Sequence, residues 1–185
     1  MERRAKRLFP PAARGSLNWE RGHLDGYGAF EALPKIEFAM ETTTRMERRQ
    51  ELLRDVFHSA PVNRLTGMRL EYDADDAAVI RLPYNPELDH GLGRIFGGIV
   101  SSMIDFTGWF TVAPHYENWM VTVEYTTRLL AEVARTDLRS RGIVRKLGRS
   151  TAFADMEVWS ADGTLVAIGS GTFRCTTRKV EKVFD

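Results

Sequence analysis

The segment from Gly98 to about Ala113 restricts the fold of this chain more than any other part of the sequence. It is predicted to be a helix, and apolar side chains occupy nearly every face of that helix. A helix of this kind must be buried on several sides. The wider apolar run from Ile95 to Tyr116 is interrupted by polar residues that include Ser101, Ser102, Asp105 and Thr107, by three glycines and by Pro114, which argues against a membrane span. We therefore expect a buried central helix.

Strand-like segments surround this helix in the sequence. Residues rich in β-branched and aromatic side chains predict strands at 65–72, 77–83, 121–127, 133–146, 151–160 and 165–176. A turn is expected at Ala161-Asp162-Gly163, a loop at 84–96 and an amphipathic helix at 45–59 that Pro61 ends. Because consecutive strands are joined by short turns, we expect an antiparallel sheet wrapped around the central helix, an α+β fold.

Composition excludes several classes of function. The 185 residues include 26 Lys and Arg against 25 Asp and Glu, so the charge balance indicates neither a nucleic-acid partner nor an anionic membrane. A lone cysteine, Cys175, forms no internal disulfide and predicts a reducing, cytoplasmic location. The four histidines have no metal-ligand spacing, so no metal site is expected.

The first 40 residues differ from the rest. They contain three prolines, four glycines and a basic start, with no sustained apolar periodicity. We predict an irregular N-terminal arm at 1–40 and one domain at 41–185. The alternative is that translation starts at Met40 or Met46. No secretory signal is expected, because Phe9-Pro10-Pro11 interrupts any apolar core of such a signal.

Asp105 is the only formally charged residue between Ile95 and Tyr116. A buried carboxylate is costly unless it is hydrogen-bonded, paired or used chemically. Two interpretations are therefore open: a structural group bonded to a nearby serine or strand amide, or a general base with a raised pKa. Gly97 and Gly98 at the helix start are either a tight turn or a backbone oxyanion site.

The sequence Phe96-Gly97-Gly98, followed by Asp105, resembles the hotdog-fold acyl-CoA thioesterases of the phenylacetyl-CoA thioesterase-like group. In that family the central helix begins with His-Gly-Gly and carries an Asp nine residues after the His. Gly93, Thr122 and the hairpin at 163–167 also fit the family's pattern. The resemblance covers about Leu65 to Cys175.

This resemblance implies a protein with a hotdog fold that assembles as a homodimer or a dimer of dimers. It also implies that the protein hydrolyses acyl-CoA thioesters. Asp105 would act as general base or nucleophile, with Thr122 orienting it. Amides of Gly97 and Gly98 would polarise the thioester carbonyl, and the site would lie across a dimer interface. The turn Gly148-Arg149-Ser150 would lie near the phosphates or pantetheine of CoA. No cofactor beyond the CoA of the substrate is implied.

The sequence departs from the family at two positions. Phe96 replaces the family histidine beside the thioester, and His90 stands where the family usually has Asn. His90 either supplies the polar contact that Phe96 lacks or is an ordinary loop histidine. The loss of the histidine leaves a second function open, a non-catalytic acyl-CoA or acyl-carrier binding protein. A hydratase or dehydratase ranks last, since only His90 would serve it.

Two further groups of residues have both a functional and a structural interpretation. Phe106, Trp109 and Phe110 either line an acyl pocket or belong to the core. A basic cluster is either a phosphate-binding face for CoA or a solvated strand face; it comprises Arg139, Arg141, Arg145, Lys146 and Arg149.

Overall fold

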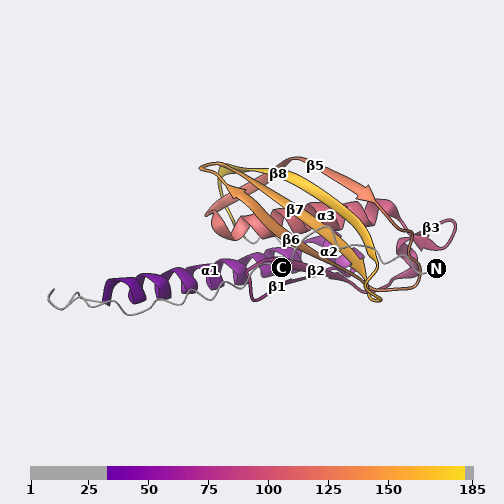
Figure 1. The fold of residues 1–185 in the computed structure, drawn as a ribbon, viewed down its shortest axis with the longest axis horizontal. Coiled ribbons are helices and arrows are strands. Elements are labelled where there is room, and N and C mark those ends of the chain that lie inside the picture. The colour runs from indigo at the N-terminus through magenta and orange to yellow at the C-terminus, as the bar shows by residue number, and fades with distance from the viewer. Residues whose placement is uncertain (1–32, 182–185) are drawn as a thin grey trace, which may run out of the picture.

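A computed structural model describes residues 33–181 and shows a six-stranded antiparallel sheet curled around helix α3, Gly97–Val112 (Figure 1). The strand order is β1-β2-β6-β7-β8-β5. The strands are β1 (Arg69–Tyr72), β2 (Ala78–Leu82), β5 (Asn118–Leu129), β6 (Leu138–Leu147), β7 (Thr151–Ser160) and β8 (Leu165–Lys179). The predicted α+β architecture, a curled sheet around a central helix, is confirmed.

Close packing of α3 on the sheet explains its apolar composition. Met103, Ile104 and Val112 are fully buried between the helix and the sheet. Gly142 on β6 lets the helix approach, since a Cβ there would lie 2.0 Å from Thr111 Oγ1. Interiors are packed at crystal-like density, so a contact this short leaves no room for a side chain. Gly142 therefore allows α3 to lie close to β6, and the distance between helix and sheet depends on the absence of a side chain there.

The N-terminal helices differ from the sequence prediction. Helix α1 spans Leu33–Ser59, so residues 33–40, expected in the irregular arm, are helical. Residues 1–32 lie outside the described residues, and the division into an arm and a domain stays a prediction. Pro61 ends α1 but also begins α2, Pro61–Thr66, because proline is well tolerated in the first turn of a helix. The strand expected from residue 65 therefore starts at Arg69.

Short elements occupy the segment expected to be a loop. It contains the 3-10 helix η1 (Pro86–Leu88) and a small hairpin of β3 (Asp89–His90) and β4 (Arg94–Ile95). Gly93 in this hairpin has a φ of +67°, which favours glycine. The turn at 161–163 is confirmed, with Gly163 at a φ of +86°.

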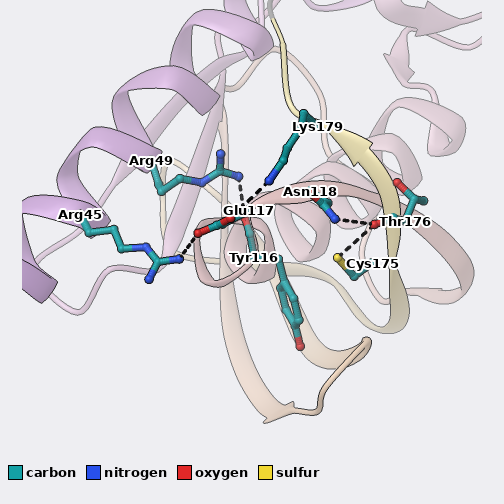
Figure 2. Close-up of polar contacts among 8 residues, drawn as sticks. All are labelled: Arg45, Arg49, Tyr116, Glu117, Asn118, Cys175, Thr176 and Lys179. Atoms are coloured by element: carbon teal, nitrogen blue, oxygen red, sulfur yellow. Dashed lines mark hydrogen bonds and ion pairs between the residues drawn. The ribbon is translucent and has the colours of Figure 1, made fainter.

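Helix α1 contacts Tyr116 and Glu117, which lie between the short helix η2 (Ala113–His115) and β5 (Figure 2). Arg45 and Lys179 pair with the two oxygens of Glu117, at 2.6 and 3.3 Å. Arg49 Nη2 donates to the Tyr116 carbonyl oxygen at 2.6 Å. Exposed ion pairs contribute little to stability, so these contacts chiefly fix where α1 lies. Within residues 33–181, no helix is long and apolar enough to cross a membrane.

Candidate active site

Asp105 lies on α3 with its carboxylate directed at β5. Thr122 Oγ1 on β5 donates a hydrogen bond to Asp105 Oδ1 at 2.8 Å. Burial raises the pKa of Asp105 above its ordinary value, while the hydrogen bond from Thr122 acts in the opposite direction. Both groups are only half-buried, so solvent or a ligand can still reach the carboxylate. A hydrogen-bonded carboxylate with a raised pKa is suited to accept a proton from water.

An apolar cavity of about 200 Å³ adjoins Asp105. Its walls come from α1, α2, α3 and the start of β5, and include Phe57, Phe106, Trp109, Phe110 and Trp119. Trp109 is fixed by a 2.9 Å hydrogen bond from its Nε1 to the Met120 carbonyl oxygen and packs against Trp119 with the rings tilted by 50° and 4.8 Å between ring centroids. A dry cavity of roughly 150 Å³ accommodates benzene. The space beside Asp105 therefore has the size of one aromatic ring or a short acyl chain.

The helix start presents a second set of functional groups. Gly97 and Gly98 are the first two residues of α3, where backbone N–H groups have no partner within the helix. No acceptor for either amide is found among residues 33–181. The glycines also have a packing reason: a Cβ on Gly97 would lie 2.8 Å from Leu129 Cδ1, and one on Gly98 would lie 2.4 Å from Phe96 Cε1. The free amides therefore fit the oxyanion interpretation, and the close contacts give these two helical glycines a packing role in addition.

His90 and Phe96 lie at this end of α3. Together with Gly97 they line a second cavity, of about 490 Å³, that also includes residues 129–133. Phe96 is 54% exposed, and His90 Nδ1 accepts a hydrogen bond from the Leu92 amide at 3.2 Å. The structure thus groups His90, Phe96 and Gly97, but it does not group them with Asp105.

Asp105 and the glycine pair are separated along α3. Asp105 is eight positions after Gly97 in α3, which corresponds to about 12 Å of helix at 1.5 Å per residue. A hydrogen bond requires a distance of about 3 Å between the donor and the acceptor atom. One thioester carbonyl therefore cannot contact the helix-start amides and the carboxylate of the same chain at once.

The turn Gly148-Arg149-Ser150 lies near the C-terminal end of α3, away from Gly97. Tyr116 Oη donates to the Gly148 carbonyl oxygen at 2.7 Å, and the Cys175 amide donates to that of Ser150 at 2.8 Å. Arg149 itself is exposed. This turn is therefore near the start of β5 and closer in the fold to Thr122 than to the helix start.

Two of the five residues of the basic cluster expected from the sequence form ion pairs. Arg141 pairs with Asp73 and Asp75, at 2.6 and 2.9 Å, and Arg145 pairs with Asp155 at 2.6 Å. For Arg141 and Arg145, these contacts favour a solvated strand face over a phosphate-binding face.

Strand β5 forms one edge of the sheet and has no strand partner on its outer side among the described residues. It nevertheless exposes large apolar side chains: Val121 (42%), Val123 (59%), Tyr125 (39%) and Leu129 (55%). An apolar edge strand with unpaired backbone groups is the kind of surface on which another chain can add a strand. This edge carries Thr122 and ends beside Gly97, so it connects both halves of the candidate site.

Sequence reasoning missed the part of the apolar cavity that α1 and α2 contribute. Val56, Phe57 and Asn63 line it, as does Trp119 at the start of β5. The amphipathic pattern at 45–59 identified the buried stripe that includes Val56 and Phe57, but not that it faces Asp105. In residues 33–181, no cluster of metal-ligating side chains is present.

Comparison with known proteins places these features in a family context. Residues 92–167 match the family model of the thioesterase superfamily. A protein of Saccharolobus solfataricus named "putative esterase" is 29% identical over 105 residues, which are 56% of this chain and 75% of that protein.

Solved structures share the fold. The PaaI protein of Escherichia coli, from its phenylacetic acid degradation operon, is 16% identical, with a TM-score of 0.67 over 76% of this chain and 99% of that one. The BH2602 protein of Bacillus halodurans, solved with CoA, is 19% identical, with a TM-score of 0.62 over 76% and 94%. The resemblance to hotdog thioesterases and the hotdog fold, both expected from the sequence, are thus confirmed.

Proposed function

We propose that this protein hydrolyses acyl-CoA thioesters to a free acid and CoA, with Asp105 as general base or nucleophile. The observation that carries the proposal is the half-buried Asp105 carboxylate, bonded by Thr122 and adjoining an apolar cavity. The match to the thioesterase superfamily supports a thioester as the substrate. The CoA in the Bacillus halodurans relative supports CoA as its thiol part.

The acyl group would occupy the cavity beside Asp105. Its walls are aromatic and aliphatic apart from Asp105 and Asn63, so a neutral apolar group fits best. At about 200 Å³ the cavity admits an aryl group or a short acyl chain. The far end of a long acyl chain would have to extend out of this cavity.

The complete site requires two chains. Because about 12 Å of helix separates Gly97 from Asp105, the carbonyl held by one chain's glycine amides would be attacked at the other chain's carboxylate. The exposed edge of β5 is the surface through which the two chains would pair, giving a homodimer or a dimer of dimers. A cytoplasmic location stays a prediction.

In the hydrolytic step, Asp105 accepts a proton from water as the water oxygen attacks the thioester carbon. The helix-start amides of Gly97 and Gly98 stabilise the negative charge that develops on the carbonyl oxygen. The C–S bond then breaks, and CoA leaves as a thiolate that takes up the proton. A thiol pKa of roughly 8.5 makes this departure easy without a strong acid. In the nucleophilic variant, Asp105 forms a mixed anhydride that water opens.

The other predicted residues have supporting roles in this proposal. Phe96 covers Gly98 and would contact the substrate near the thioester. His90, in the same cavity as Gly97, would donate to the carbonyl or orient water. Gly148, Arg149 and Ser150 of the second chain would contact the phosphates or the pantetheine arm of CoA.

Release of free thiol from a panel of acyl-CoAs tests the proposal. We expect thiol release by the wild type and its loss in Asp105→Asn, with Asp155→Asn as a control for removal of a surface carboxylate. Absence of release for every acyl group would contradict hydrolysis. Retained CoA binding in that case would favour the alternative, a non-catalytic acyl-CoA or acyl-carrier binding protein, which the replacement of the family histidine by Phe96 supports.

A further inference from the structure

Three arginines and a tryptophan form a row across the outer face of the sheet. Arg69 on β1 is opposite Arg81 on β2, Arg81 is opposite Arg139 on β6, and Arg139 is opposite Trp159 on β7. Neighbouring strands lie about 4.8 Å apart, so the Cα atoms of the three arginines lie within roughly 10 Å of one another. Like charges directly opposite each other on a sheet are destabilising. Repulsion between these arginines therefore lowers the stability of the fold when no anion lies between them.

The charges of this row are only partly neutralised. Arg81 pairs with Glu71 at 2.9 Å. Arg69 and Arg139 have no carboxylate partner in the part of the chain that the structure describes. Asp137, also at this face, accepts a hydrogen bond from the Tyr84 amide at 2.9 Å. Two exposed guanidinium groups, one on each side of Arg81, are thus available to an anion.

A hollow of about 750 Å³ lies over the row. Its lining includes the three arginines, the two carboxylates of Glu71 and Asp137, and Trp159. Trp159 is half-buried and faces outward, because its neighbours Val158 and Ser160 are buried. Ligand sites usually have volumes of roughly 300–1,000 Å³. A tryptophan face beside arginines offers a stacking surface for a planar ring next to donors for phosphate oxygens.

We infer that this hollow, which we name the Arg–Trp face (Arg69, Arg81, Arg139 and Trp159), binds a phosphorylated nucleotide. The base stacks on Trp159, and the phosphates accept hydrogen bonds from Arg69 and Arg139. This site lies on the outer face of the sheet, whereas Asp105 lies beneath its inner face. The inference therefore stands or falls independently of thioester hydrolysis.

Calorimetric titration of the full chain tests the inference with four probes. ADP represents a free nucleotide, adenosine the base alone, pyrophosphate the phosphates alone, and CoA a nucleotide carried by a substrate. We expect ADP to bind at least about tenfold more tightly than either adenosine or pyrophosphate. Competition distinguishes the two sources of nucleotide. Displacement of ADP by CoA indicates that the face holds the nucleotide end of CoA, and simultaneous binding indicates a free nucleotide. Both results support the inference.

Matched variants locate the binding. Arg69→Gln and Arg139→Gln should each weaken ADP binding about tenfold, whereas Arg178→Gln, which removes the same charge from an exposed end of β8, should not. Trp159→Leu should weaken it as well, and Trp159→Phe, which keeps a stacking ring, should retain most of it. Absence of ADP binding would overturn the inference. So would equal binding by the Arg139→Gln and Arg178→Gln variants, or binding of pyrophosphate as tight as that of ADP.

Discussion

The Thr122 hydroxyl donates a 2.8 Å hydrogen bond to Asp105, which joins the edge strand β5 to the central helix α3. Asp105 is the only charged residue of the apolar helix α3. The hydrogen bond holds it next to β5, which has no strand partner on its outer side among the described residues. The same contact opposes the rise in the pKa of Asp105 that burial causes. Thr122 therefore contributes both to the position of the carboxylate and to its acidity, the latter against the effect of burial.

Replacement of Thr122 by valine should raise the pKa of Asp105 further, because the carboxylate loses its donor while its burial is kept. A base acts in its deprotonated form, so the acidic limb of the kcat/KM profile should move to higher pH. Thr122→Ser, which retains the hydroxyl, should leave that limb near the wild-type position. An unchanged profile in Thr122→Val would show that Thr122 does not control the base.

Asp105→Asn should stabilise the fold at neutral pH. A carboxyl group whose pKa is raised on folding destabilises the folded state at pH values where it ionises. This penalty is absent below the unfolded pKa, grows as the pH rises from the unfolded to the folded pKa, and is constant above the folded pKa. Urea unfolding at pH 7 should therefore give the variant a higher free energy of unfolding than the wild type, and the difference should shrink on acidification. A less stable variant at pH 7 would mean that the bond from Thr122 outweighs burial.

The wall of the cavity beside Asp105 should set the preferred acyl length. Trp119→Ala removes a large half-buried ring from that wall. We expect kcat/KM for acyl groups larger than one ring to rise about tenfold relative to short ones, a usual effect of enlarging an apolar pocket. Phe153→Ala, at an exposed aromatic on β7 that does not line the cavity, is the matched control. The same shift in both variants would contradict the assignment of the cavity.

Gly142→Ala should destabilise the protein by about 1–3 kcal/mol, as overpacking of a core does. The new Cβ would meet Thr111 Oγ1 at 2.0 Å, between α3 and β6. The double variant Gly142→Ala/Thr111→Ala should recover part of the loss, because it removes the contacted oxygen. Denaturant unfolding of the two single variants, Gly142→Ala and Thr111→Ala, and of the double variant measures this. Additive losses in the double variant would show that the two residues do not compete for the same space.

The sequence allowed the buried core of the fold to be predicted, but not the parts that depend on distant contacts. Helix α3 and strand β7 were expected with nearly the observed bounds, because their apolar patterns are local. Helix α2 was missed, since Pro61 both ends one helix and begins another. The position of Trp119 beside Asp105 and the separation of His90 from Asp105 arise from packing of segments that no local pattern relates.

The edge of β5 should be required for activity as well as for assembly. Val123→Lys places a charge on a side chain that is 59% exposed on this strand. We expect it to lower the dimer fraction in sedimentation experiments and to lower thiol release in parallel. Leu147→Lys, at a 42% exposed site on β6, is the control and should change neither. A monomeric Val123→Lys protein with full activity would contradict a site built from two chains.

Mixing of two inactive variants tests the two-chain site most directly. Asp105→Asn removes the base, and Gly98→Pro removes one helix-start amide. Proline is tolerated in the first turn of a helix, and the Phe96 ring that the new side chain would meet is exposed and has room to turn away. A mixed dimer contains one site with the intact base of one chain and the intact amide of the other. After subunit exchange, an equimolar mixture should regain about a quarter of wild-type thiol release, since half of the dimers are mixed and half of their sites are complete. A mixture that exchanges subunits but stays inactive would contradict the account.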